Sequence, residues 1–464
     1  MNENNTFETN TFGFNLPCRQ FVIAAERTKE RRLPMVDEFI LRTLLVVKSI
    51  SADRLARFFG FEGRDLGIAV SDLQSRSLVT VDGDNLGLHP SAKEMFRTST
   101  EDVPTITVAE PLNADVWFDL VTKHMVSGRG LRNIPHLIPL PLRQQIDEAE
   151  ARAAFHDNFR DYLRIARNDP KADQWSLYSI LDVHAGRYSF VQIGGSERLT
   201  LQGAPRLESH LSLRETDSKG RGKQLTEAMS IELRKLDHVN PSQVSSNEFA
   251  RMFNHRDWSQ WFRPEGHFDL ASWFQQEMNS SSAGTVPLVG YPYVERNRRA
   301  ITSLLEDAPL DFSGDHRWQT WWLRPGGSLW GATEDVPATL EALRGVIRAR
   351  AKGGMLSSVV ISPASVTDTL SKTFTRVFDM GVRAPTKKVP TALEVVLIAE
   401  RVAVVSVMVA LSESVCVPIG YATNDDARVR RIAELSGIGE LVREGTRLWP
   451  PRYTQVRKAV RLKG

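Results

Sequence analysis

The stretch ISADRLARFFGFEGRDLGIAVSDLQSRSLVTVDGDNLGLHPSAKEMF, residues 50–96, carries the most specific order of structural signals in the chain. Ser51 can cap a helix that ends at Gly60, and a second helix is predicted from Arg64 to Arg76. The segment SLVTVDGDNLGLH then alternates like two strands around an Asp-Gly-Asp-Asn turn. The sequence therefore predicts a helix, a tight turn, a second helix and a hairpin in this order.

A further helix is predicted immediately before this stretch. Apolar residues recur there at the spacing of one helical face, which we expect to be buried: Val36, Phe39, Ile40, Leu44 and Val47. In the helix over 64–76 the inward side chains are expected to be Leu66, Ala69, Val70 and Leu73. Residues 36–97 thus have the pattern of a small three-helix module with a β-hairpin.

This order resembles the winged helix-turn-helix domains of bacterial and archaeal transcription regulators. The resemblance implies that the third helix enters the major groove of DNA and that the hairpin, or wing, rests on the backbone. Carried over by position, the residues expected to face DNA are Arg64, Ser71, Gln74, Ser75 and Arg76, with Asp84 and Asn85 at the wing tip.

The charge of this module is a poor match for DNA by itself. Residues 36–97 hold eight Lys or Arg and nine Asp or Glu, a balance of −1, whereas neutralisation of phosphates normally dominates affinity. Two basic segments elsewhere can supply charge, or can simply be solvated surface. They are RTKERR, with Arg31 and Arg32, and the C-terminal RYTQVRKAVRLKG, with Arg457, Lys458, Arg461 and Lys463.

Composition indicates an ordinary soluble protein. The 464 residues are 41% hydrophobic and 25% charged, with a net charge of only +3, so about three domains and no general attraction to nucleic acid or membrane are expected. Two cysteines are too few for a disulfide framework or a zinc site. The first residues lack the pattern of a signal peptide, and no run has the length of a membrane span. The sequence predicts a cytoplasmic protein.

The predicted fold class is α+β and multidomain. The expected parts are an N-terminal arm (1–35), the winged helix (36–100), a mixed α+β middle region (101–285), an α/β domain with a helix-covered sheet (286–449) and a basic tail (450–464). In the middle region, residues 98–113 are predicted to be a connector, 144–167 one amphipathic helix, and 175–195 a meander of short strands.

The segment LEVVLIAERVAVVSV, residues 393–407, resembles the strand-turn-strand of phospholipase-D-like domains, which regulators of the TrmB type combine with a winged helix. The catalytic signature of that family is a His, any residue and a Lys, followed by an Asp. None of the ten histidines here has Lys two positions later. The resemblance therefore implies a degenerate domain that serves sensing, dimerisation or docking.

Other catalytic patterns are incomplete. The segment DSKGRGKQ lacks the Gly and the Ser or Thr of a phosphate-binding loop, at Asp217 and Gln224. Glu265, His267 and Asp269 lie close together, but alternate residues of a loop are more often surface groups than a metal or acid/base site. The tryptophan-rich tracts at 257–274 and 318–330 offer base stacking, although Trp more often fills a core. We expect no metal and no cofactor.

Three functions are compatible with the sequence. The first is a non-catalytic transcription regulator that couples the winged helix to a sensing or partner-docking domain. The second is a DNA-recognition or scaffold subunit of a bacterial multiprotein system, such as phage defence or mobile-element machinery. The third is a nucleic-acid-processing enzyme with an unrecognised site. The expected partners are double-stranded DNA and either protein partners or a second copy of the chain, with no membrane.

Overall fold

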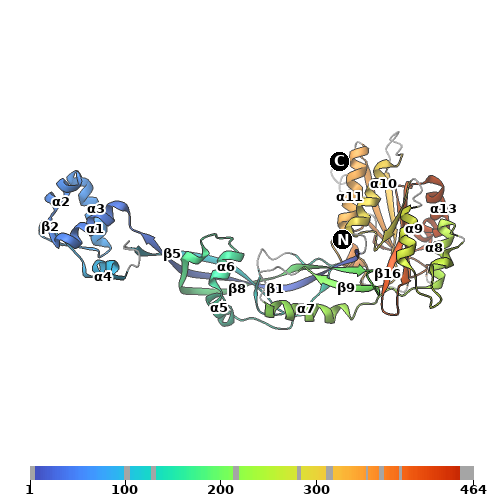
Figure 1. Ribbon diagram of the computed structural model, residues 1–464, viewed down its shortest axis with the longest axis horizontal. Helices are drawn as coiled ribbons and strands as arrows, with labels where there is room; N and C mark the ends of the chain where they lie inside the picture. Colours follow the sequence, from blue (N-terminus) through green and yellow to red (C-terminus); the bar gives the residue numbers. More distant parts are fainter. Residues whose placement is uncertain are drawn as a thin grey trace, which may run out of the picture.

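A single strand of 27 residues, β1 (Thr6–Arg32), organises the molecule in the computed structural model of the protein. It pairs antiparallel with β5 (Thr105–Asp119) along one edge and with β8 (Trp175–Thr200) along the other. At the usual rise per residue, β1 runs for about 90 Å. The resulting sheet is an arm between a small helical module and a larger α/β domain (Figure 1).

The structure describes residues 6–98, 105–126, 132–212, 219–255, 257–279, 284–309, 317–351, 354–364, 370–385 and 389–449. The expected α+β, multidomain fold class is confirmed. None of the helices in these ranges has the length and apolar character needed to cross a bilayer. The predicted basic tail, with Arg457, Lys458, Arg461 and Lys463, lies outside the described residues.

The structure of the arm corrects four predictions. The expected N-terminal arm is instead the central strand of a six-stranded sheet, ordered β6-β5-β1-β8-β9 with β7 beside β1. Residues 105–113 of the predicted connector and the whole of the predicted meander are each part of one long strand, β5 and β8, because their partners lie on β1, far away in sequence. The helix predicted over 144–167 is two helices that meet at Asn158. The remaining arm elements are β6 (Met125–Val126), β7 (Ile138–Pro139), α5 (Glu148–Asp157), α6 (Phe159–Ile165), η2 (Ala172–Gln174), β9 (Arg206–Leu211) and α7 (Lys219–Leu233).

The N-terminal module, residues 33–98, contains the predicted helices and hairpin in the predicted order. A short additional strand joins the hairpin to make a three-stranded sheet, β2-β4-β3. The elements are α1 (Met35–Val47), β2 (Ser49–Ser51), α2 (Ala52–Phe59), α3 (Gly63–Ser75), β3 (Val79–Asp82), β4 (Asn85–Leu88) and α4 (Pro90–Thr98). Their core is formed chiefly by Ile40, Leu41, Leu44, Leu55, Leu66, Leu73, Leu78 and Leu86.

The buried face of α1 was predicted only in part. Ile40 and Leu44 are buried as expected, but Val36, Phe39 and Val47 are exposed. The helix MVDEFILRTLLVV is apolar on most of its circumference, so spacing alone does not show which face meets the core.

The C-terminal domain is an eight-stranded mixed sheet in the order β10-β16-β15-β14-β11-β12-β13-β17. Alternate residues of its central strands enter two separate cores, one on each face. The strands are β10 (Thr285–Val289), β11 (Arg317–Leu323), β12 (Met355–Ser362), β13 (Met380–Arg383), β14 (Leu393–Ile398), β15 (Val402–Ala410), β16 (Cys416–Thr423) and β17 (Thr446–Trp449).

Helices cover both faces of this sheet. One core includes aromatic residues from α8, η3 and α9, and the other includes aliphatic residues from α10 and α11. Residues 243–279, expected in the middle region, therefore pack on the C-terminal sheet. The helices are α8 (Gln243–Phe253), η3 (Trp258–Trp261), α9 (Leu270–Asn279), α10 (Glu295–Asp307), α11 (Asp335–Arg350), α12 (Leu370–Phe374), α13 (Asp426–Ser436) and α14 (Ile438–Glu444).

The start of β1 is bound to the C-terminal domain by main-chain hydrogen bonds. Tyr291 N donates to Thr9 O at 2.8 Å, and Gly13 N donates to Ala332 O at 2.7 Å. The Tyr293 hydroxyl donates to Asn10 Oδ1 at 2.8 Å in a buried position. These contacts fix the base of the arm to the domain, and the arm in turn carries the N-terminal module.

Candidate nucleic-acid interface

Helix α3 presents one solvent-facing stripe. Arg64, Ser71 and Ser75 are exposed and follow one another at helical spacing, as does Ile68, which is 64% exposed. Leu66 and Leu73 lie on the opposite side, in the core. The stripe combines a cation, two hydroxyls and one apolar side chain, a set that can contact phosphates, base edges and thymine methyl groups.

The flanks of this stripe differ in charge. Gln74 is exposed on one flank, where its amide can donate and accept hydrogen bonds. Asp65 and Asp72 are exposed on the other. The acidic flank is unfavourable beside phosphate, so the Gln74 side is the better approach for DNA.

Arg76 is placed differently from the prediction. Its Nη2 donates to Asp37 Oδ2 at 2.5 Å, and the same guanidinium pairs with Asp72. Asp37 is a nearly buried residue of α1. The Arg76 guanidinium therefore joins α3 to α1, and we remove Arg76 from the set expected to face DNA.

The β3–β4 hairpin is exposed at its tip. Asp82 and Asn85 are paired across the turn, and Gly83 takes a positive φ of 56° that favours glycine. Asp84 O accepts a hydrogen bond from Ala52 N at 2.9 Å, which fixes the hairpin against the start of α2. The tip carries Asp82 and Asp84 beside Asn85, so it offers polar contacts but no positive charge.

The basic segment before the module divides into two halves. Arg27 and Lys29 pair with Glu110 and lie over the ring of Trp175, at 3.6 and 4.0 Å from its centroid. Both cations therefore interact with groups of the arm. Arg31 and Arg32 are exposed at the end of β1, opposite residues 105–106 and next to α1.

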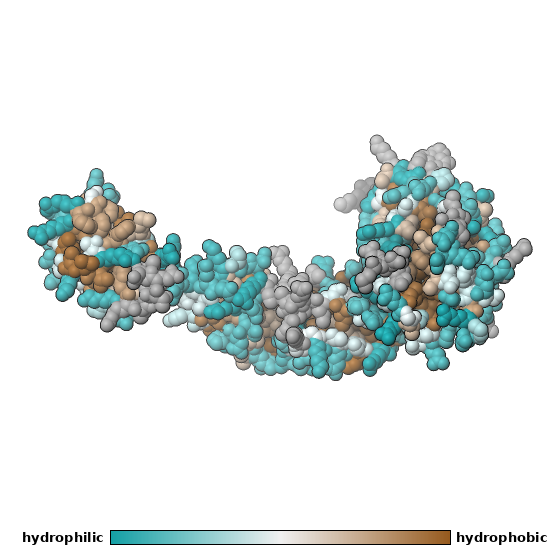
Figure 2. Space-filling model, viewed as in Figure 1, coloured by the Kyte–Doolittle hydropathy of each residue, from teal (hydrophilic) through white to brown (hydrophobic). Residues whose placement is uncertain are grey.

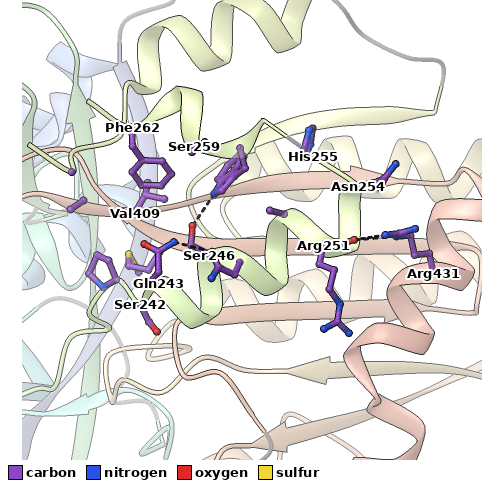
Figure 3. A pocket seen from close by; sticks show the side chains of 17 residues that line it. Ser242, Gln243, Ser246, Arg251, Asn254, His255, Ser259, Phe262, Val409 and Arg431 are labelled. Atoms are coloured by element: carbon purple, nitrogen blue, oxygen red, sulfur yellow. Dashed lines mark hydrogen bonds between the residues drawn. The ribbon is translucent and has the colours of Figure 1, made fainter. Parts of the chain in front are cut away.

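The C-terminal domain has an open groove of about 670 Å³ between α8, η3, the end of β15 and α13. Phe262 and Val409 lie at one end, and Arg251 and Arg431 at the other (Figure 3). The Arg431 guanidinium donates to the main-chain carbonyl of Arg251 through Nε and Nη2, at 3.1 and 2.8 Å. The exposed amides of Gln243, Asn247 and Asn254 complete a polar lining suited to a small polar ligand or a peptide.

A buried polar cluster lies at the centre of the same domain. Trp322 Nε1 and Trp330 Nε1 each donate to Glu394 Oε1 at 2.8 Å, and Ser406 Oγ donates to Oε2 at 3.2 Å. Burial raises the pKa of Glu394 to about 7 and lowers the pKa of the nearby Arg324 to about 10. The cluster is enclosed and fully hydrogen-bonded, which indicates a structural role.

The remaining candidate groups do not converge on a reaction centre. Trp258, Trp261, Trp273, Trp322 and Trp330 are buried, which confirms the expectation that these tracts fill a core. Arg263 N donates to His267 O within a turn, and Arg263 pairs with Asp269. Within the described ranges no group of three or more His, Cys, Asp or Glu is arranged to hold a metal ion.

Comparison with known proteins finds weak structural similarities. No family model and no curated protein matches the chain. Among solved structures, NucT from Helicobacter pylori is 11% identical with a TM-score of 0.24, over 35% of this chain and 97% of its own. TrmBL2, described as an archaeal chromatin protein with a novel mode of DNA binding, is 8% identical with a TM-score of 0.24, over 51% of this chain and 72% of its own. Likenesses at this level do not assign a family.

Two features of the candidate interface were not predicted from the sequence. Ile68 was not among the residues expected to face DNA. Its position four residues after Arg64 and three before Ser71 was the available signal. The pairing of Arg76 with Asp37 was missed because it joins residues 39 positions apart.

Proposed function

We propose that the chain is a non-catalytic DNA-binding protein in which residues 33–98 act as a winged helix. Helix α3 would enter the major groove with Arg64, Ile68, Ser71 and Ser75, and Gln74 would lie on the favourable flank. The observation that carries the proposal is this exposed stripe, backed by a close-packed core and placed beside an exposed hairpin. The arm holds it far from the C-terminal domain, where a duplex has access (Figure 1).

Arg31 and Arg32 support the same proposal. They are exposed just before α1, next to a module whose own charge is −1. With Arg64 they give about three cations for phosphate contacts. At about 0.9 counterions released per contact, the logarithm of the binding constant should fall with the logarithm of salt concentration with a slope of roughly −3.

A charge-reversal variant tests the role of α3. We expect Arg64→Glu to weaken binding of a labelled mixed-sequence duplex at least tenfold in a fluorescence-anisotropy titration, because it replaces attraction by repulsion at the phosphates. The matched control is Arg299→Glu, the same change at another exposed arginine, on α10 in the C-terminal domain. Equal affinity of the two variants would contradict the assignment of α3.

Regulation of transcription is the role we propose for such a protein, with the groove beside α8 as the place where a ligand or a partner is sensed. Its lining of arginines, amides and an aromatic ring suits a polar, anionic or peptide ligand. Ligand binding there would act on DNA binding through the arm, since the base of the arm is hydrogen-bonded to the same domain.

A second candidate is a recognition or scaffold subunit in which the module docks on protein rather than on DNA. Phe58 and Ile68 favour it, because they are 70% and 64% exposed on a module without net positive charge. Absence of duplex binding at low salt would select this function. Metal-dependent cleavage of plasmid DNA would instead select an enzyme.

A further inference from the structure

Helix α1 has a second apolar face that the module does not use. Met35, Phe39 and Val46 are 73%, 53% and 80% exposed, and Val36 and Val47 flank them. These residues fall on one side of the helix, opposite the buried Leu44 and Leu41. Figure 2 shows hydrophobic side chains on the surface of this module, at the far end of the arm. We call Met35, Val36, Phe39, Thr43, Val46 and Val47 the outer face of α1.

The one hydroxyl group of the outer face does not need a partner from outside the helix. Thr43 Oγ1 donates to Phe39 O at 2.8 Å, one helical turn back, so this hydroxyl is already hydrogen-bonded within the helix. A contiguous apolar surface of this kind is uncommon on a monomeric protein and typically marks a contact. The face extends along 13 residues, a length of about 20 Å.

We propose that the occupant of this face is the same helix of a second copy of the chain, in antiparallel orientation. A two-fold axis level with Leu41 would place Met35 against Val47, Val36 against Val46 and Phe39 against Thr43 of the other copy. Every apolar residue of the face then meets an apolar residue or Thr43, and the Arg42 side chain, which is paired with Glu38 of its own chain, borders the contact.

The charges at the edge of the face support this orientation. Glu38 lies along one edge, and Arg42, which follows Met35 by seven residues and Phe39 by three, lies between that edge and the outer face. Arg42 Nε donates to Glu38 Oε1 at 2.9 Å. In an antiparallel pair related by a two-fold axis, each edge faces the same edge of the other copy. Glu38 of one copy then comes nearly level with Arg42 of the other. In a parallel pair this charged edge would face the apolar edge formed by Val36 and Val47.

Self-association through α1 leaves α3 available. The two helices pack through their buried sides, where Leu44 meets the same core as Leu66 and Leu73, and Asp37 bonds Arg76. Their exposed stripes are therefore on different parts of the module surface. A dimer would carry two α3 stripes, and it would form whether or not DNA is bound.

Sedimentation velocity of the full chain without DNA tests the proposal. One 13-residue helix per copy gives a small interface, so we expect dimerisation with a dissociation constant on the order of 1–100 μM. The double variant Phe39→Glu with Val46→Glu should raise that constant at least tenfold, with an unchanged circular dichroism spectrum. The matched control is Val244→Glu, at a valine of α8 that is 65% exposed. A monomer at all concentrations, or equal weakening by the control, would overturn the proposal.

A second experiment tests the orientation with milder changes. Glu38→Arg gives a chain whose edge is wholly basic, and Arg42→Glu gives one whose edge is wholly acidic. In the antiparallel arrangement each variant dimerises more weakly alone than the original chain, and a mixture of the two forms mainly heterodimers. Native mass spectrometry of the mixture, with one chain isotopically labelled, measures the ratio of heterodimers to homodimers. A statistical mixture of homodimers and heterodimers would overturn the antiparallel pairing.

Discussion

Asp37 and Arg76 illustrate how single residues divide between binding and stability in the N-terminal module. Both are charged residue types that are ordinarily exposed, yet Asp37 shares the buried face of α1 with Ile40, Leu41 and Leu44, and the Arg76 guanidinium donates a hydrogen bond to it. Arg64, at the other end of the same helix, has an exposed side chain. Sequence spacing predicted which residues of α3 lie on its outer side, but it could not predict which of them has a partner on another helix.

We expect Arg76→Glu to open the module, because it removes the partner of a nearly buried carboxylate and places a like charge beside it. The loss should be about 3 kcal/mol. Hydrogen exchange of the α1 and α3 amides measures it locally. Arg64→Glu is the matched control on the same helix, with an expected change within about 0.5 kcal/mol. Equal protection in both variants would show that the Asp37 pair does not stabilise the module.

Glu394 predicts a specific dependence of stability on pH. Its pKa is raised from an ordinary value of 4.5 to about 7, chiefly because burial disfavours the charged carboxylate. The folded protein therefore holds this proton more tightly than the unfolded chain does. The resulting stabilisation is complete below pH 4.5 and is lost as the pH rises through 7.

Glu394→Gln should remove this dependence while keeping an oxygen that accepts the Trp322 and Trp330 hydrogen bonds. At pH 8 the variant should be the more stable protein, by up to about 3 kcal/mol. At pH 5 the two should be similar. The melting temperatures of both proteins at pH 5 and pH 8 test this prediction. A lower melting temperature of the variant at pH 8 would contradict the raised pKa of Glu394.

At the scale of elements, the sequence predicted the compact C-terminal strands better than the arm. MLSSVVIS and VAVVSVMVA form strands β12 and β15, and their sequences indicate this directly because buried strands are continuous apolar runs. By contrast, β1 begins TFETNTFGFN, where polar residues alternate with aromatic ones and no turn marks its length. Its partners β5 and β8 lie up to 194 residues away (Thr6 opposite Thr200), and local patterns contain no information on such pairing.

The junction of β1 with the C-terminal domain depends on a close backbone approach at Gly290. This residue has a positive φ of 92°, and a Cβ atom there would lie 2.7 Å from Thr9 Cα. Gly290→Ala should therefore push the start of β1 away from the domain and lower the melting temperature by several degrees, corresponding to about 2 kcal/mol or more.

Gly266→Ala is the control for this prediction. Gly266 has a similar φ of 84°, but a Cβ atom there would meet nothing within 4 Å. Both variants carry the backbone strain of an alanine at positive φ, so the difference between them isolates the contact with β1. Equal melting temperatures by calorimetry would show that the approach of Gly290 to Thr9 is not needed for stability.

At the scale of the whole molecule, the arm separates the two candidate binding sites. The groove beside α8 lies at one end and the stripe of α3 at the other, joined by a β-sheet whose central strand is continuous (Figure 1). The sequence predicted the parts at both ends but not their separation. That separation arises from strand pairing between distant segments, whereas the predicted middle region was expected to be a domain of its own.

The central claim is that the N-terminal module binds duplex DNA. Fluorescence anisotropy of a labelled mixed-sequence duplex, measured at two salt concentrations for the full chain and for a chain ending at residue 449, tests it most directly. We predict salt-sensitive binding that survives removal of the basic tail, with the slope of roughly −3 set by Arg31, Arg32 and Arg64. Loss of binding with the tail would move the contact to the C-terminus, and no binding at low salt by either chain would contradict DNA binding by this protein.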